Sequence, residues 1–426
     1  MELYYTFSIF IVLASWFAYL NLRFLKLPTT IGIMVIAVLV SIGIRLLGDQ
    51  LFPEATRDFF KLISQFDFDE VLMGAMLNFL LFAGALHINI ADLREHRLAI
   101  MLYSTVSVVL SAFFIAGFLF YICPLFGVSL PFIYCLLFGT LISPTDPIVV
   151  LSVLKQVKVP KSIETKITGE SLFNDGVAVV MFAVVLRLAL SEDVDITFLS
   201  VSKFFAQEVI GGVLVGFLLG YSASHVMKKI DDYKVTVLIT LALVMGGFLL
   251  TKTLHVSSPL AMVIAGLVIG NYGKKVAMND ETQDYLTKFW ELIDEILNAI
   301  LFMFIGFELL LLPDIEKHIW LALITILVVL FSRMLSILIP YRVFSRNRIY
   351  TKGSLIVLVW GGIRGGVSIA LVLSLPYNEY KEMLLEITYI VVLFSIVVQG
   401  LSIGKVAKTV LKEETSEKNL ENPTQK

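Results

Sequence analysis

Charged residues are scarce in this chain. Asp, Glu, Lys and Arg make up 16% of its 426 residues, whereas soluble domains carry about a quarter. Hydrophobic residues reach 58% and gather in apolar runs of about 20 residues, the length that crosses a bilayer as a helix. The composition therefore predicts an all-α polytopic membrane protein and excludes a soluble domain.

Other signals are also missing. The two cysteines, Cys123 and Cys135, have no metal-binding spacing, and the net charge of −2 implies no attraction to nucleic acid. The N-terminus lacks a basic region and a small-residue cleavage site, so we expect the first apolar run to be a retained span. No histidine lies at mid-depth of a span, and Ser171 has no histidine partner. We therefore predict that the protein is not an enzyme and has no cofactor.

The apolar runs predict about thirteen spans. They lie at 4–22, 30–47, 71–88, 99–122, 131–154, 167–188, 206–227, 234–252, 257–271, 289–312, 319–339, 353–375 and 384–405. Of the 33 Lys and Arg residues, 23 belong to one set of alternating loops and 8 to the other. Cytoplasmic loops are enriched in these residues, so we expect the N-terminus outside the cell membrane and the C-terminus in the cytoplasm. The polar tail, 412–426, is expected to lack ordered structure.

A polar segment, Ser143-Pro144-Thr145-Asp146-Pro147, interrupts the fifth span. Each proline removes a backbone donor and disfavours helical geometry at the residue before it. The helix should therefore break at mid-membrane and free carbonyls and amides, as in transporters that bind ions at broken helices. The alternative is a simple proline kink in which Asp146 is hydrogen-bonded to a neighbour.

The sixth span begins with a second polar segment, Gly169-Glu170-Ser171-Leu172-Phe173-Asn174-Asp175. Glu170 and Asn174, like Ser171 and Asp175, are four residues apart, so all four side chains face one side of a helix. Asp175 lies roughly 13 Å from the cytoplasmic boundary and Asp146 about 12 Å from it. Carboxylate, hydroxyl and carbonyl oxygens at one depth suit a weakly held monovalent cation. A carboxylate can hold a proton or a cation but not both, which would give exchange. The alternative is a polar network that only holds helices together.

Glu170 needs a cationic partner, and we expect it to be Arg364. This arginine lies in Trp360-Gly361-Gly362-Ile363-Arg364-Gly365-Gly366, at the middle of the twelfth span. Glycines there permit unwinding or close helix approach. Two interrupted spans in corresponding halves indicate an inverted-repeat transporter with a site at the midplane. Arg333, in the eleventh span, is expected to pair structurally.

Together these three segments resemble those of the NhaP/NHE-type sodium/proton antiporters, the monovalent cation:proton antiporter family. Leu301-Phe302-Met303-Phe304-Ile305-Gly306-Phe307-Glu308 and Gln399-Gly400-Leu401 are similar to further family segments. The resemblance covers about residues 10–405 and implies thirteen helices in two inverted six-helix repeats with crossed, unwound helices. It implies one exchanger domain, 4–411, in a homodimer. Its core bundle would be 99–188 and 319–405, its dimerisation bundle 4–88 and 234–312, and its linker helix 206–227.

The resemblance also assigns roles to individual residues. Asp175, Ser171 and Thr145 would bind Na⁺, and Asn174 and Asp146 would complete or polarise the site. Glu170 and Arg364 would form a structural ion pair.

The Asn174-Asp175 pair resembles the electroneutral branch of the family, which implies exchange of one cation for one proton. Some members have a glutamate in the third span where this chain has Ala83, so the choice among Na⁺, Li⁺ and K⁺ stays open. The main prediction is an Na⁺ (and Li⁺)/H⁺ antiporter. One alternative is an exchanger of K⁺ or another monovalent ion on the same scaffold. Another is a cation-binding sensor or channel, although the tail is short for an output domain.

Overall fold

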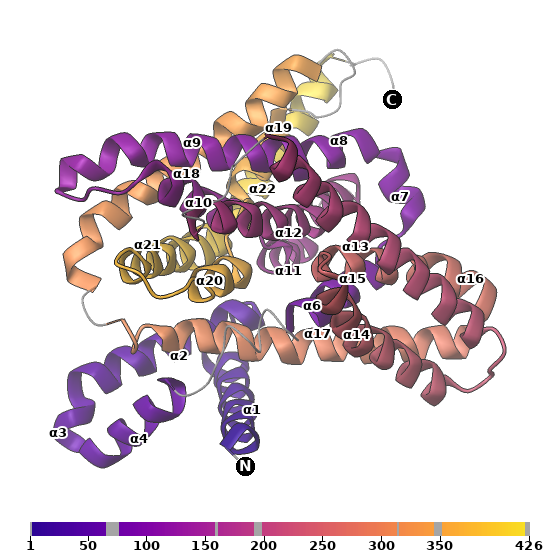
Figure 1. Ribbon diagram of the computed structural model, residues 1–426, viewed down its shortest axis with the longest axis horizontal. Helices are drawn as coiled ribbons and strands as arrows, with labels where there is room; N and C mark the ends of the chain where they lie inside the picture. Colours follow the sequence, from indigo (N-terminus) through magenta and orange to yellow (C-terminus); the bar gives the residue numbers. More distant parts are fainter. Residues whose placement is uncertain are drawn as a thin grey trace.

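The structure is a computed structural model that describes residues 2–64, 76–157, 161–190, 198–312, 315–344 and 352–421. Within these ranges the chain forms helices and no strand (Figure 1). The helices are α1 (Glu2–Leu20), α2 (Thr29–Gly43), α3 (Asp49–Leu51), α4 (Pro53–Ser64), α6 (Leu77–Leu86), α7 (Ile90–Glu95), α8 (Arg97–Met101), α9 (Ser107–Ile122), α10 (Phe132–Ile142), α11 (Pro147–Val157), α12 (Lys161–Leu190), α13 (Phe198–Met227), α14 (Tyr233–Leu254), α15 (Ser258–Val268), α16 (Lys274–Ala277), α17 (Asp280–Glu308), α18 (Ile315–Phe344), α19 (Lys352–Trp360), α20 (Gly366–Leu373), α21 (Lys381–Phe394) and α22 (Gly400–Glu421).

Short polar residues start several of these helices. Asp232 accepts from the amides of Lys234 and Val235 at the start of α14, and Ser257 caps α15. Asn279 accepts from the amide of Thr282 and starts α17. Such side chains satisfy amides that have no partner inside the helix, so the loop sequences fix where these helices begin.

The protein is a polytopic membrane protein. Among the described residues, ten helices are long and apolar enough to cross a bilayer, and Leu77–Leu86 is a shorter apolar helix. Helices also occupy the other predicted spans: α17 at 289–312, and α19 with α20 at 353–375. The predicted span at 71–88 falls partly outside the described residues. The count of thirteen therefore remains a prediction.

Both expected interruptions are present. Residues 143–146 separate α10 from α11, and residues 361–365 separate α19 from α20. For residues 412–421 the expectation of a tail without ordered structure was wrong, because α22 continues to Glu421; residues 422–426 lie outside the described residues. Lysine, glutamate and leucine favour helix, and extending an existing helix needs no new nucleation.

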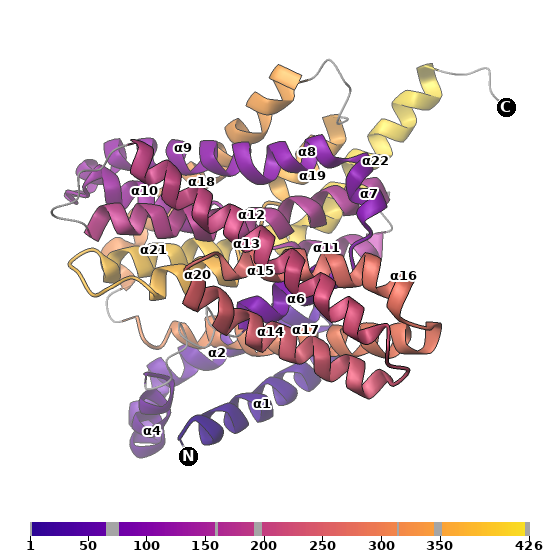
Figure 2. The ribbon, with the colours of Figure 1, turned by 45° about the vertical axis from the view of Figure 1, so that its right-hand side comes forward.

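The helices can be divided into two groups. We call α8–α12 and α18–α22 the upper group, and α1–α4, α6 and α14–α17 the lower group. In both views α9, α10 and α18 lie at the top and α1, α2, α4 and α17 lie toward the bottom, while α11, α15 and α20 lie at similar heights between them (Figures 1 and 2). In the upper group, α18 packs against α9 and α21; in the lower group, α2 packs against α17 and α6 against α15. The short helices α7 and α16 lie at one end of the molecule, and α3 and α4 lie at the opposite end. This agrees with the predicted placement of their loops on opposite sides of the membrane.

Candidate functional site

The break between α10 and α11 exposes backbone groups that other segments satisfy. The amide of Asp146 donates to the carbonyl of Ile363 over 2.7 Å, so the two broken segments bind each other directly. The amide of Ile148, in the first turn of α11, donates to Asp146 Oδ1 over 2.8 Å. The carboxylate of Asp146 therefore caps α11, as short acidic side chains do at helix starts, and its second oxygen remains for other partners.

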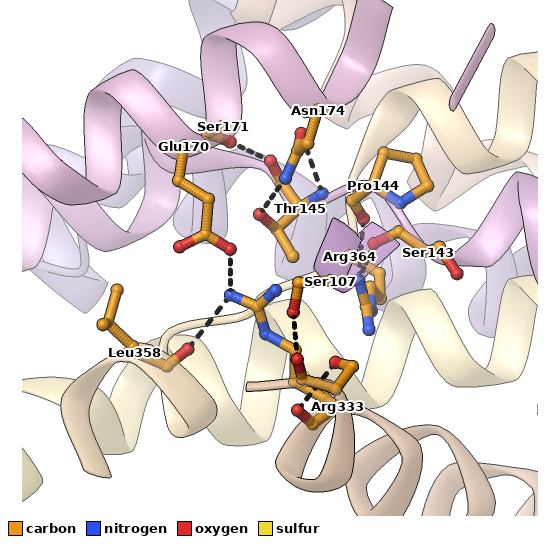
Figure 3. Close-up of polar contacts among 11 residues, drawn as sticks. Ser107, Ser143, Pro144, Thr145, Glu170, Ser171, Asn174, Arg333, Leu358 and Arg364 are labelled. Carbon is orange, nitrogen blue, oxygen red and sulfur yellow. Dashed lines mark hydrogen bonds and ion pairs between the residues drawn. The ribbon is translucent and has the colours of Figure 1, made fainter. Parts of the chain in front are cut away.

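Helix α12 presents its polar face to the same break, as the four-residue spacing predicted. Asn174 Nδ2 donates to Thr145 Oγ1 over 2.8 Å, and Ser171 Oγ donates to the Thr145 carbonyl. Thr145 N lies 3.5 Å from Asn174 Oδ1, to which it donates (Figure 3). Glu170, Ser171, Asn174 and Asp175 are all buried. The structure thus brings Thr145 together with the residues of α12 that the sequence singled out.

The second break is held by the C-terminal helices. The amide of Arg364 donates to Ser395 Oγ over 2.9 Å, and Ser395 Oγ donates to Gln399 Oε1 over 2.5 Å. Gln399 Nε2 in turn donates to the Trp360 carbonyl over 2.9 Å. Gln399 was predicted only as part of a family segment, and Ser395 was not predicted. A serine and a glutamine four residues apart in an apolar run were the available signal.

Glycine is required where the two breaks touch. A Cβ built on Gly365 would lie 2.1 Å from Asp146 Oδ2, and one on Gly362 would lie 2.7 Å from Arg333 Nε. No real Cβ approaches another atom so closely, so any larger residue at either position would displace the charged group. The glycines of the twelfth span therefore make room for a carboxylate on one side and a guanidinium on the other.

The expected ion pair between Glu170 and Arg364 was wrong. Arg333, on α18, is the cation that the structure pairs with Glu170, with Nη2 and Oε1 2.5 Å apart (Figure 3). Arg364 instead donates through Nη1 to the carbonyls of Ser143 and Pro144. The guanidinium of Arg364 is already bonded to the carbonyls that the α10–α11 break frees. Gly362 has no side chain, so Arg333 fits beside it. The expected structural pairing of Arg333 is confirmed.

A cavity of about 790 Å³ adjoins this cluster. Buried Thr145 and Asp175 and half-buried Asp146 line it, and Ala83 contributes a wall without a polar side chain. Exposed acidic groups also line it, including Glu291, whose carboxylate lies 3.6 Å from His87 Nε2. Helices of both groups line the cavity, α6 and α17 from one and α11, α12 and α20 from the other.

The donor set limits which ion could bind. Among the described residues, no group of three or more His, Cys, Asp or Glu side chains could hold a metal ion. The two carboxylates of Asp146 and Asp175 are accompanied by neutral hydroxyl, amide and carbonyl oxygens. Divalent cations prefer six or more oxygens with several carboxylates. This arrangement therefore fits a transient monovalent cation better than a permanent metal.

Comparison with known proteins adds independent findings. The family model described as "Sodium/hydrogen exchanger, transmembrane" matches residues 9–409. The Na(+)/H(+) antiporter NhaP of Pseudomonas aeruginosa is 49% identical over 415 residues, which are 96% of this chain and 97% of the relative. The Na(+)/H(+) antiporter NhaH of Halobacillus dabanensis is 35% identical over 318 residues, 72% of this chain and 77% of the relative.

The fold also matches a solved structure. The sodium proton antiporter MjNhaP1 from Methanocaldococcus jannaschii, at pH 8, gives a TM-score of 0.76 at 20% identity. The match covers 96% of this chain and 100% of the other.

Proposed function

Because the chain belongs to the sodium/hydrogen exchanger family of Na⁺/H⁺ antiporters, we propose that it exchanges one Na⁺ or Li⁺ for one proton through competition at Asp175. The observation that carries the proposal is a buried Asp175 and a half-buried Asp146 beside a broken helix, both lining one cavity. Charged groups at membrane depth are costly and mark ion and proton pathways. Asp175 would hold either the proton or the cation. Each ion would therefore bind to the site only after the other has been released, which couples their movement across the membrane.

The remaining ligands follow from the contacts at the break. Ser171 Oγ donates to the Thr145 carbonyl. Both oxygens would coordinate a cation held by Asp175. Asn174 orients Thr145 through its hydroxyl, and Asp146 polarises the site from the opposite segment. Glu170 with Arg333 fixes α12 to α18, and Arg364 fixes the broken backbone of the fifth span.

Transport requires the site to face each side of the membrane in turn. The core bundle, 99–188 and 319–405, would move against the dimerisation bundle, 4–88 and 234–312, with 206–227 as the linker helix. The two helix groups and the cavity that both line support this division. Two inverted six-helix repeats would place the breaks at 143–146 and 361–365 in equivalent positions. The protein would act as a homodimer through the second bundle.

The distribution of lysine and arginine sets the orientation that we propose. The loops with 23 of these residues would face the cytoplasm, with the N-terminus outside the cell membrane. The cavity is also lined by Asn89, Asp92 and Glu164, which lie in or beside these loops. In this orientation the cavity would open toward the cytoplasm, as in an inward-facing state.

Exchange in proteoliposomes tests the proposal. Vesicles with an internal pH dye and an imposed pH gradient would receive Na⁺, Li⁺, K⁺ or choline in turn. We expect Na⁺ and Li⁺ to move protons in the wild type and not in Asp175→Asn. Asp284→Asn is the matched control, because Asp284 is exposed and pairs with Lys288 on α17. A response to K⁺ alone would favour the alternative exchanger, and no response to any alkali cation would refute antiport.

Stoichiometry needs a separate measurement. Exchange of one cation for one proton moves no net charge. Clamping the membrane potential at different values with K⁺ and valinomycin should therefore leave the Na⁺-driven rate unchanged. A rate that changes strongly with the potential would contradict electroneutral exchange.

A further inference from the structure

Ser368 is a buried polar residue of the cavity to which the proposed mechanism gives no role. It is the third residue of α20, it is 1% exposed, and it lines the same cavity as Asp146 and Asp175. Its hydroxyl has no hydrogen-bond partner among the described residues. A buried hydroxyl without a partner costs free energy, so its position beside an ion pathway calls for an explanation.

The helix break explains why this hydroxyl has no local partner. Serine and threonine inside helices usually donate to the carbonyl three or four residues earlier. Ser374 does so to Leu371 over 2.9 Å, and Thr388 does so to Leu384 over 2.6 Å. For Ser368 the corresponding carbonyls belong to Arg364 and Gly365, in the non-helical break before α20. The Gly365 carbonyl accepts instead from the backbone amide of Ser368, over 3.2 Å.

Location distinguishes Ser368 from other unpartnered hydroxyls. The hydroxyls of Thr30, Ser111 and Ser332 also lack a hydrogen-bond partner among the described residues. None of these three residues lines the cavity that contains Asp175. Ser368 thus combines two independent features, a free hydroxyl and a place in the wall of the ion cavity.

The start of α20 is close to the carboxylates. Gly365, three residues before Ser368, is the residue whose Cβ would lie 2.1 Å from Asp146 Oδ2. Helix α20 also packs against α10 and α12, the latter carrying Asp175. On the α6 side of the cavity, Ala83 offers no side-chain oxygen. A cation between the two aspartates would therefore meet oxygen ligands from the α10–α11 break and from α12, and on the α20 side Ser368 supplies a further one.

We propose that the Ser368 hydroxyl is an oxygen ligand of the transported monovalent cation, which its place in the wall of the cavity that Asp146 and Asp175 also line supports. The proposal rests on the antiport function proposed above. A neutral hydroxyl suits a transported ion, because hard cations prefer oxygen ligands and a further charge would hold the ion too tightly for release. The hydroxyl finds its partner only when the cation is bound, so it favours the loaded site over the empty one.

The experiment compares Ser368→Ala with Ser111→Ala. Ser111 is the matched control, because it is also a buried serine without a hydrogen-bond partner, in α9, but outside the cavity wall. Proteoliposome exchange would give the half-saturating concentrations of Na⁺ and Li⁺ and the maximal rate. We expect Ser368→Ala to raise the half-saturating Na⁺ concentration by about tenfold, because the cation would lose one contact comparable to a hydrogen bond to a charged group. The ratio of the Na⁺ and Li⁺ values should change as well.

Rescue separates ligation from structure. Ser368→Thr keeps the hydroxyl and should retain values near the wild type, and Ser111→Ala should match the wild type. If Ser368→Ala does not fold, Ser368→Cys keeps the size of the side chain, and its thiol is a poor ligand for a hard cation. The proposal would be overturned if Ser368→Ala and Ser368→Cys kept the wild-type half-saturating concentrations for Na⁺ and Li⁺. A wild type that exchanges no alkali cation would instead refute antiport itself, whatever the serine variants do.

Discussion

Neutralising Arg333 should destabilise the protein far more when Glu170 keeps its charge than when Glu170 is neutralised as well. The two side chains are 4% and 3% exposed, and Nη2 and Oε1 are 2.5 Å apart. Water cannot replace a lost partner at such a site. Removing one member of a buried pair costs about 3–5 kcal/mol, because the other charge remains buried and uncompensated. Removing both charges eliminates that penalty.

A double-mutant cycle measures this coupling. Glu170→Gln, Arg333→Met and the double variant would be compared by denaturant unfolding of the detergent-solubilised protein. We expect the double variant to be more stable than the sum of the single effects predicts, by about 2–3 kcal/mol. A second cycle with Arg364→Met is the control, since Arg364 Nη1 contacts the Ser143 and Pro144 carbonyls.

Two results would refute the reasoning. Additive effects of Glu170→Gln and Arg333→Met would mean that the 2.5 Å contact contributes no coupling. If Glu170 were coupled more strongly to Arg364 than to Arg333, the Glu170–Arg364 ion pair expected from the sequence would be correct after all. In either case the placement of Arg333 between α12 and the second break would need revision.

Three further predictions concern transport. Gly365→Ala should slow exchange, because the new Cβ would lie 2.1 Å from Asp146 Oδ2; Gly246→Ala, whose Cβ meets no atom within 4 Å, should leave the rate unchanged. Arg364→Lys should lower the maximal rate despite conserving charge, since a lysine cannot reproduce the planar set of guanidinium donors that holds two carbonyls; wild-type rates would contradict that role. Competition at Asp175 predicts that the half-saturating Na⁺ concentration rises as the pH falls on the cation-loading side, and a value independent of pH would argue against a shared site.

Local chemistry explains which features could be predicted from the sequence. The break before Pro147 follows from the missing donor and from the steric restriction that proline places on Asp146. The shared face of Ser171 and Asn174 follows from helix periodicity alone. Both features depend on residues within one helical turn of each other, and the structure shows both.

Lateral neighbours could not be predicted in the same way. The rise per residue gives the depth of a charge in the membrane, but Arg333 and Arg364 both lie at depths that Glu170 could reach. Which one pairs depends on how α18 packs and on the space beside Gly362, and these are long-range contacts. The role of Ser395 was missed for the same reason, since its hydroxyl accepts from the backbone amide of Arg364 on another segment.

The two breaks satisfy each other's backbone, and this bears on how the site could move. The Asp146 amide binds the Ile363 carbonyl over 2.7 Å, and Arg364 holds the Ser143 and Pro144 carbonyls. Ser143, Ile363 and Arg364 are buried, so water could not readily replace these bonds, and separating the segments would leave several polar groups unsatisfied. Movement of one break past the other is therefore more costly than movement of both together. The bonded pair of breaks favours a mechanism in which the cation site moves as a rigid unit within the core bundle, while the contacts that change are the apolar ones between the two helix groups.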